Sequence, residues 1–384
     1  MKAFSYLASS ALLCWSFSYA SPQVYQDAVS ATTLVASQIT TTASASTSTS
    51  TIACNNSPLL CDRNYNNITH MGAHDSFALR DSSTDYTVAG NQFYNATLAL
   101  SAGLRLLQVQ AHLSDDVIEL CHTTCALLDG GTLESYLSSV KTWMDANPNE
   151  VVTLLIVNSD DQTAATFGAV FASSGISTYG YTPTSTTGPV ATWPTLQTLI
   201  TANTRLVTFI ASITYDETYP YLLSEFDYVF ETAYGQVDFT DFTCDLDRPT
   251  TLSSAAVAVS SGYMGLLNHF KEEVQAFADI PDVDNITTTN SPSTSLLGAV
   301  GTHGSNCKTE WGVMPTFILV DFWNVGPSVE TADILNVVTG TGRTNVSESV
   351  VTQSSESFGV SLQEIGPGRI AGWALAAVML GNFI

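Results

Sequence analysis

Residues 67–76 read NITHMGAHDS, a short apolar stretch that ends in a histidine and an aspartate. In an extended strand successive side chains point to opposite faces, so His70, Gly72 and His74 share one face. The His74-Asp75 pair then falls at the carboxyl end of the strand. We therefore predict a buried strand here, with titratable groups where it ends.

The next apolar stretch, residues 104–112, reads LRLLQVQAH. Its alternation places Gln108, Gln110 and His112 on the same face as Leu106. Polar side chains are costly to bury inside a parallel sheet unless they find partners or line a cavity. We therefore predict that Gln108, Gln110 and His112 line a substrate-binding cavity.

Further apolar stretches alternate with helical patterns along the chain. Predicted strands cover residues 151–158, 206–212, 228–232, 264–268 and 316–322, and predicted helices cover 133–147, 164–174, 196–203 and 329–338. Strands rich in Val, Ile and Leu that are separated by helices indicate parallel βαβ units. We predict an α/β protein with a single distorted (β/α)8 TIM-type barrel over residues 54–342, whose site lies at the carboxyl ends of the strands. A doubly wound sheet is the rival fold, but the glycine-rich fingerprints of nucleotide-binding folds are absent from the sequence.

Both ends of the sequence predict export. Residues 1–20 combine Lys2, an apolar run and a small-residue site, which is typical of a signal peptide; the run is shorter than the roughly 20 residues of a membrane span. Residues 21–53 are rich in Ser and Thr and are predicted to form a stalk. Residues 343–384 join a Ser-rich spacer to an apolar tail, as in a GPI-anchor signal, with a buried terminal helix as the alternative. We expect an extracellular protein that is held on the outer membrane leaflet at the cell surface.

Cysteine usage agrees with export. Six cysteines remain when Cys14 leaves with the signal peptide, and an even number in an exported chain indicates three disulfides. Sequence proximity favours Cys54–Cys61 and Cys121–Cys125, which leaves Cys244–Cys307, although six cysteines allow about fifteen pairings. A zinc site is a weaker alternative because Cys121 and Cys125 have no matching second pair.

The composition restricts the partners. Eleven Lys and Arg residues stand against 35 Asp and Glu residues, for a net charge of −24, and nucleic acid binding requires clustered basic residues. Nucleic acid is therefore excluded as a partner, and we expect a monomer. Five glycosylation sequons predict a glycoprotein, at Asn55, Asn67, Asn95, Asn285 and Asn345.

Histidines are concentrated near the predicted site. A third stretch ends in His122 between two cysteines, and the last core strand carries Asp321 at its carboxyl end. Two histidines beside one cavity can act as base and acid because their ordinary pKa values lie near neutral pH, and a carboxylate can orient one ring. We predict that two of the histidines at strand ends form such a pair. We interpret His269 and His303 as buried core histidines, with His303 in Gly301-Thr-His-Gly304 as a weaker site candidate.

Taken together, five motifs resemble the phosphatidylinositol-specific phospholipase C X-domain superfamily, and within it the secreted fungal and plant phospholipase C-like phosphodiesterases. The motifs are Cys61-Asp-Arg followed by Gly72-Ala-His-Asp-Ser76, Gly103-Leu-Arg-Leu-Leu-Gln108, Leu120-Cys-His122, Asn147-Pro-Asn-Glu-Val-Val152 and Val320-Asp-Phe-Trp323. The resemblance covers roughly residues 58–340. It implies a distorted α/β barrel that cleaves the glycerol–phosphate bond of inositol phospholipids.

The resemblance also implies catalytic roles. His74 matches the base that takes the proton of the inositol 2-hydroxyl, and His122 matches the acid that protonates the leaving diacylglycerol oxygen. Asp75 matches the polar residue beside the base, and Asp321 is the carboxylate implied to orient the base.

The substrate-binding positions differ from the family pattern. On the second strand, metal-free relatives carry an Arg and metal-dependent relatives carry acidic calcium ligands, where this chain has Gln108 and Gln110. On the third strand the family has Lys or Glu, where this chain has Asn158. A neutral amide can donate a hydrogen bond to a phosphoryl oxygen but supplies no charge. We therefore predict Gln108, Gln110, His112 and Asn158 as substrate-binding residues, with no metal and no cofactor.

The expected function is that of a secreted phospholipase C-like phosphodiesterase, a phosphoric diester hydrolase or phosphorus–oxygen lyase. Its substrate is expected to be an inositol phospholipid, a glycolipid or a related phosphodiester. One alternative is a catalytically impaired barrel that binds glycan or lipid at the cell wall. Another is a metal-dependent phosphodiesterase of the glycerophosphodiester or sphingomyelinase D kind, which requires a Glu-x-Asp pair where Gln108-Val-Gln110 stands.

Overall fold

A computed structural model describes residues 52–190, 192–275 and 279–352 of the chain. The predicted signal peptide, nearly all of the predicted stalk and most of the predicted anchor signal lie outside the described residues. None of the described helices has both the length and the apolar character needed to cross a bilayer.

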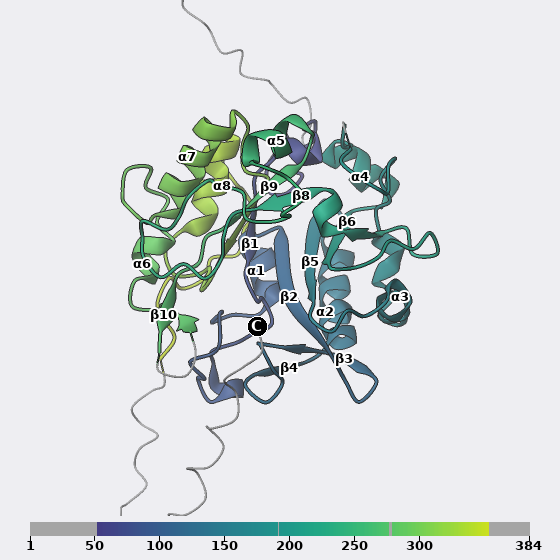
Figure 1. Cartoon of the computed structure of the whole chain (residues 1–384), viewed down its shortest axis with the longest axis horizontal. Helices are drawn as coiled ribbons and strands as arrows, with labels where there is room; N and C mark the ends of the chain where they lie inside the picture. The colour runs from purple at the N-terminus through teal and green to yellow at the C-terminus, as the bar shows by residue number, and fades with distance from the viewer. Residues whose placement is uncertain (1–51, 191, 276–278, 353–384) are drawn as a thin grey trace, which may run out of the picture. The chain divides into compact units, whose positions relative to one another are not determined.

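Eight strands form a continuous parallel sheet in the order β7-β6-β5-β2-β1-β12-β9-β8. In chain order these are β1 (His70–Ala73), β2 (Leu106–Ser114), β5 (Val152–Asn158), β6 (Leu206–Ala211), β7 (Leu222–Ser224), β8 (Val229–Glu231), β9 (Met264–Asn268) and β12 (Phe317–Val320). The sheet curls into a barrel flanked by helices (Figure 1). Among the described residues no ladder joins β7 to β8, so the barrel is open along one seam. The predicted distorted α/β barrel is thus confirmed.

Two antiparallel additions decorate the barrel. Strand β2 continues beyond its parallel neighbours and pairs with β3 (Val117–Cys121), which in turn pairs with β4 (Asp129–Thr132). The β2–β3 turn places Asp115 and Asp116 at positive φ, as a two-residue hairpin turn requires. A separate pair joins β10 (Glu272–Val274) to β11 (Asp279–Pro281). These pairs and the short β7 were not predicted from the sequence.

Helices follow most of the barrel strands. They are α1 (Ala96–Ala102), α2 (Leu133–Ala146), α3 (Ala164–Ser173), α4 (Leu196–Ala202), α5 (Ala255–Ser260), α6 (Ile286–Thr289), α7 (Val300–Trp311) and α8 (Ser328–Asn336). Short 3-10 turns cover Pro58–Leu60, Tyr65–Asn67, Ser82–Thr84, Ile176–Tyr179 and Glu225–Asp227. Thr132, Thr163 and Thr195 cap α2, α3 and α4, because each side chain accepts a hydrogen bond from a backbone amide in the first turn. The four helices predicted from periodicity, α2, α3, α4 and α8, are all present within one or two residues of their predicted ends.

Neighbouring residues of the strands face two different cores, as the period of two predicts. Leu106 packs inside the barrel with Phe209 and Phe317, whereas Leu107 packs outside against α2 and α3. Gly72 lies opposite Leu106 on the inner side, and a Cβ there would come within 2.7 Å of the Leu106 side chain. The inner core closes the barrel below the carboxyl ends of the strands, so those ends are where polar groups can gather.

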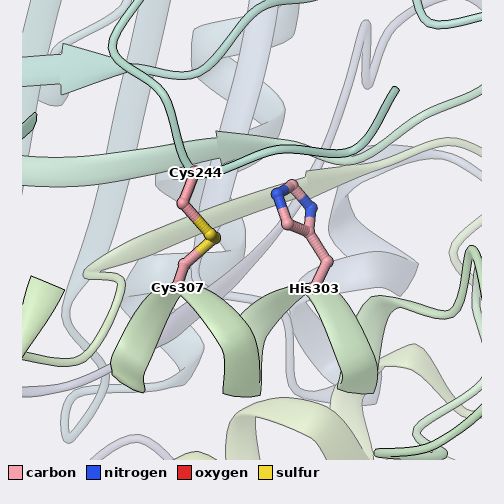
Figure 2. Close-up of side chains that lie close together, drawn as sticks. All are labelled: Cys244, His303 and Cys307. Carbon is pink, nitrogen blue, oxygen red and sulfur yellow. A yellow bond between two sulfur atoms is a disulfide. The ribbon is translucent and has the colours of Figure 1, made fainter. Parts of the chain in front are cut away.

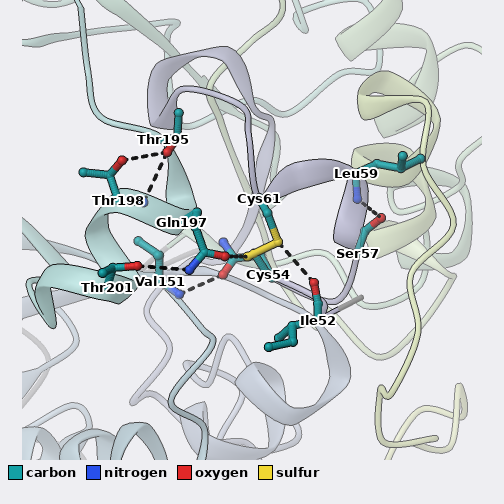
Figure 3. Close-up of a disulfide and its surroundings, with 11 residues drawn as sticks. Ile52, Cys54, Ser57, Leu59, Cys61, Val151, Thr195, Gln197, Thr198 and Thr201 are labelled. Carbon is teal, nitrogen blue, oxygen red and sulfur yellow. Dashed lines mark hydrogen bonds between the residues drawn. A yellow bond between two sulfur atoms is a disulfide. The ribbon is translucent and has the colours of Figure 1, made fainter. Parts of the chain in front are cut away.

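Three disulfides hold loops against this barrel, and all three pairings favoured from the sequence are present. They are Cys54–Cys61, Cys121–Cys125 and Cys244–Cys307. The Cys54–Cys61 disulfide fixes the first described residues beside α4, where Gln197 lies 3.7 Å from the Cys54 sulfur (Figure 3). The disulfides therefore fix three parts of the chain to the barrel: the first described residues, the β3–β4 loop and α7.

Four of the five sequons are exposed, but Asn55 is not. The Asn55 side chain is only 5% exposed, and its Oδ1 accepts a hydrogen bond of 2.7 Å from the Val151 amide. The Asn55 Nδ2, the atom to which an N-linked glycan is joined, is buried as well, so a glycan there would have to open the surrounding packing. The structure therefore corrects the sequence expectation at Asn55, whereas Asn67, Asn95, Asn285 and Asn345 remain candidate acceptors.

Candidate active site

The parallel register of β1 and β12 brings His74 and Asp321 together. Each residue directly follows its strand, and the His74 amide donates a 3.0 Å hydrogen bond to the Val320 carbonyl. The His74 Nδ1 then lies 2.9 Å from the Asp321 Oδ1. Asp321 is buried, and 14% of the His74 side chain is exposed, so this ring sits at the carboxyl end of the barrel with limited access.

Asp75 turns back toward the same side as His74. Its φ of +38° ends the strand, so the alternation of an extended chain no longer applies. Its backbone amide donates a 2.6 Å hydrogen bond to the Gln108 Oε1, which holds this unusual conformation. The Asp75 carboxylate is fully buried, and neither oxygen accepts a hydrogen bond from the described residues.

His122 approaches the same carboxylate from the β3–β4 loop. Its Nε2 lies 3.6 Å from the Asp75 Oδ2, and the His74 Nε2 lies 3.9 Å from that oxygen. The Cys121–Cys125 disulfide and a 3.1 Å hydrogen bond from the His122 amide to the Leu128 carbonyl fix the loop. The structure thus places the two predicted catalytic histidines on one buried carboxylate.

The surroundings of His74 and His122 shift the pKa values of the two rings in opposite directions. Burial alone would lower the pKa of His74, but the negative charges of Asp321 and Asp75 raise it to about 9. Burial lowers the pKa of His122, and Asp75 opposes this only in part. Burial raises the pKa of Asp75, and the two histidines oppose that shift. Near neutral pH the free protein therefore holds a proton on His74 rather than on His122.

Four residues that the sequence analysis did not identify complete the surroundings of His74. Asn91 donates a 3.1 Å hydrogen bond to the Asp321 Oδ1, and Gln92 donates one of 2.6 Å to the His74 carbonyl. The ring of Phe270 stacks on the His74 imidazole, and Glu272 contributes a nearby negative charge. They come from the loop after β1 and from the chain after β9, and no spacing in the sequence links them to His74.

The predicted substrate-binding residues divide into two groups. Gln108 contacts Asp75 as described, and the Gln110 Oε1 accepts a 3.1 Å hydrogen bond from the Thr123 amide, next to His122. The His112 Nδ1 instead lies 3.4 Å from the Asp160 carboxylate, on the extension of β2. Asn158 exchanges hydrogen bonds with the backbone of Gln162 and so shapes the loop after β5. The structure therefore brings only Gln108 and Gln110 to the histidine pair.

Arg105 directly precedes β2, at the amino end of the strand, whereas the histidine pair lies at the carboxyl ends of the strands. The buried Arg105 guanidinium pairs with Glu150 and donates hydrogen bonds to the carbonyls of Leu100 and Leu104. Arg105 therefore anchors backbone and cannot supply a cation to the histidine pair.

The described residues contain one cluster with metal-ligand chemistry, formed by Cys244, His303 and Cys307. The two cysteine sulfurs are bonded to each other, so this cluster does not present free thiolates for a metal. Near the histidine pair, the side chains of Gln108 and Gln110 offer only neutral oxygens.

Comparison with known proteins identifies the family of the chain. The PI-PLC X 1 family model matches residues 60–336, so the chain belongs to the PI-PLC X domain family. Two proteins of Arthroderma benhamiae are each 36% identical to the chain. One is named "PI-PLC X domain-containing protein 1", and the match covers 74% of this chain and 90% of that protein. The other is named "Uncharacterized secreted protein", and the match covers 76% of this chain but only 65% of that longer protein.

Similarity to solved structures is weaker. The phosphatidylinositol-specific phospholipase C of Staphylococcus aureus is 13% identical, with a TM-score of 0.48, and the match covers 72% of this chain and 94% of that one. The enzyme of Listeria monocytogenes is 14% identical, with a TM-score of 0.47 and the same shares covered.

The link between Asp321 and His74 predicts a pH effect. Acid–base catalysis requires one proton on the histidine pair, so kcat/KM should fall as the pH rises through about 9, where His74 loses its proton. Replacing Asp321 with Asn removes a charge that raises this pKa, so the alkaline limb should move to lower pH. A pH profile of phosphatidylinositol turnover measures the shift. Asp116→Asn, which removes an exposed carboxylate from the β2–β3 turn, is the control, and an equal shift in both variants would contradict the assignment.

Proposed function

We propose that this protein is an extracellular phospholipase C-like phosphodiesterase that acts on inositol phospholipids or related phosphodiesters through His74 and His122. One observation carries the proposal: both Nε2 atoms lie within 4 Å of the same Asp75 oxygen. One phosphodiester bound beside Asp75 can therefore meet a base and an acid together. Membership of the PI-PLC X family supports this reaction class.

In the proposed reaction, a substrate hydroxyl attacks phosphorus while His74 Nε2 accepts its proton. A new O–P bond forms, the bond from phosphorus to the leaving oxygen breaks, and His122 donates a proton to that oxygen. Asp321 holds Nδ1 of His74 and stabilises the imidazolium that forms. Carboxylates that are hydrogen-bonded to a catalytic histidine have the same role in other enzymes. With an inositol phospholipid the products would be a cyclic inositol phosphate and diacylglycerol.

The resting protonation states are opposite to those that this reaction requires. His74 carries the proton in the free protein, whereas the reaction starts from neutral His74 and protonated His122. A bound phosphodiester anion favours a positive charge on the ring beside it, so substrate binding would raise the pKa of His122. The reaction then proceeds from a minor protonation form of the protein. Because the two histidines interact, pKa values measured from a pH–rate profile describe the His74–His122 pair and not either residue alone.

The experiment that tests this function is turnover of phosphatidylinositol vesicles by the purified protein, with the cyclic phosphate product followed by phosphorus NMR. Release of a cyclic product that depends on His74 supports the proposal. A protein that binds these vesicles but releases no product would support the alternative, a barrel that binds lipid or glycan without catalysis. The neutral amides at Gln108 and Gln110 are the feature that favours this alternative.

Activity should survive removal of divalent metal. Calcium prefers several charged oxygens, and the positions where metal-dependent relatives carry acidic ligands are the neutral Gln108 and Gln110 here. The Asp321 carboxylate is already engaged by His74 and Asn91. Turnover in excess EDTA is therefore expected to match turnover without chelator. Loss of activity in EDTA that added calcium restores would show that the chain holds its metal with other ligands.

We further propose an extracellular location, because a relative is named as a secreted protein and three disulfides are present. The proposed GPI anchor, which would hold the protein on the outer membrane leaflet, rests on the sequence of residues 343–384.

A further inference from the structure

The His74 ring is held on its face as well as on its edge. The Phe270 ring lies parallel to it, with 3.7 Å between the ring centroids and 4° between the planes. Phe270 is 4% exposed and comes two residues after β9, the strand that pairs with β12. The Asp321 bond lies in the plane of the imidazole, whereas the Phe270 contact is perpendicular to that plane.

These two contacts restrain different motions. A single hydrogen bond to Nδ1 leaves the imidazole free to swing about that contact, and such a swing would redirect Nε2. A flat ring against the face of the imidazole prevents this swing by steric contact. A protonated imidazole also gains an electrostatic attraction to the aromatic face.

Phe270 is itself held by a group of residues that we call the α7 anchor, namely Thr243, Cys244, His269, His303 and Cys307. His269 precedes Phe270, and its Nδ1 lies 2.9 Å from the Nδ1 of His303 on α7. The His303 Nε2 lies 3.0 Å from the Thr243 carbonyl, and the Cys244–Cys307 disulfide ties the same loop to the same helix (Figure 2).

The remaining contacts of the α7 anchor fix the backbone of His269. The His269 amide donates a 2.9 Å hydrogen bond to the Leu319 carbonyl of β12, and its Nε2 lies 2.9 Å from the Thr289 carbonyl. The Phe242 ring packs 4.0 Å from the His269 ring, and His269 is fully buried. The chain that carries Phe270 is thus held on two sides by contacts that do not involve His74.

We propose that Phe270 is a positioning residue that fixes the plane of the His74 imidazole, and that the α7 anchor holds Phe270 in place. The proposal rests on the assignment of His74 as the base. It gives a role to His269 and His303, which the sequence analysis interpreted as core histidines, with His303 as a weaker site candidate. It also links the longest-range disulfide of the described chain to the geometry of the site.

The test compares Phe270→Leu with Phe270→Tyr. Leu retains apolar volume without a flat aromatic face, and Tyr retains the ring. In Phe270→Leu we expect kcat on phosphatidylinositol to fall about tenfold with KM nearly unchanged, and Phe270→Tyr should restore most of the loss.

A second measurement does not depend on turnover. NMR titration of the imidazole, assigned by comparison with His74→Asn, reports the midpoint of His74 directly. The carboxylates of Asp321, Asp75 and Glu272 face this ring and remain in the variant. We expect the midpoint to fall in Phe270→Leu because the aromatic face favours the protonated ring, and to return toward about 9 in Phe270→Tyr.

Phe171→Leu is the matched control, because Phe171 is a buried aromatic residue of α3 in the outer core. It should lower the melting temperature while leaving the titration of His74 and the kcat unchanged. A Phe270→Leu protein whose His74 midpoint and kcat both equal those of wild type would overturn the proposal. Absence of turnover in the wild type would instead count against the proposed function, and the titration would still decide the role of Phe270.

Discussion

Replacement of His74 or His122 with alanine is expected to lower phosphatidylinositol turnover by about 10²–10⁴-fold. Each ring handles one of the two protons in the proposed reaction, and both Nε2 atoms address the same Asp75 oxygen. Because the two act as one unit, the double variant should be little slower than either single variant. Steady-state rates on vesicles of defined composition measure the effect.

The control for this prediction separates chemistry from folding. Removal of His74 leaves Asp321 and Asp75 buried without a neighbouring positive charge, and unpaired buried charges destabilise proteins. His74→Asn keeps an N–H donor that can reach Asp321, so it should fold better than His74→Ala and be as inactive. If either single histidine variant, properly folded, retained the wild-type rate, the mechanism would be wrong.

Removal of the Cys244–Cys307 disulfide by the double Ser variant is expected to lower the free energy of unfolding by about 4 kcal/mol. This disulfide spans 63 residues, so its loss restores a large amount of conformational freedom to the unfolded chain. Denaturant titration under non-reducing conditions measures the change. The same variant should lower kcat on phosphatidylinositol, since the disulfide is part of the α7 anchor.

The matched comparison is the Cys54–Cys61 disulfide, which spans only 7 residues. Its removal should cost about 2 kcal/mol by the same loop-entropy argument, and it should leave kcat unchanged. Equal losses of stability for the two disulfides would show that loop length does not set their contributions. A stable Cys244–Cys307 variant with normal kcat would separate the disulfide from the placement of Phe270.

The barrel could be predicted because its signals are local. Strands such as β5 and β6 are long apolar runs, and helices such as α2 bury residues at helical spacing. Each of these elements can therefore be predicted from its own residues alone. The disulfide pairing followed from proximity, since two pairs are close in sequence and the third is what remains. Strand β7 escaped prediction because three residues are too few to show a period.

The candidate site could be predicted from the sequence only in part. His74, Asp75, His122 and Asp321 stand at the ends of predicted strands or beside a predicted disulfide, and the resemblance to the family gave them their expected roles. Their mutual geometry was not available, because His74 and Asp321 are 247 residues apart and meet only through the register of β1 and β12. His112 and Asn158 share the same pattern, yet their side chains turn to Asp160 and to the loop after β5.

The sequence by itself indicated the barrel, its long strands and four of its helices, the favoured disulfides and the chemical character of the candidate catalytic groups. Tertiary structure alone decided which groups meet and in which protonation state they rest. The positive φ of Asp75 turns its carboxylate toward two histidines, and Phe270 reaches His74 from a distant part of the chain. The physical reason is that periodicity and residue type act along the chain, whereas burial, charge and ring stacking depend on distances between segments that only the folded barrel brings together.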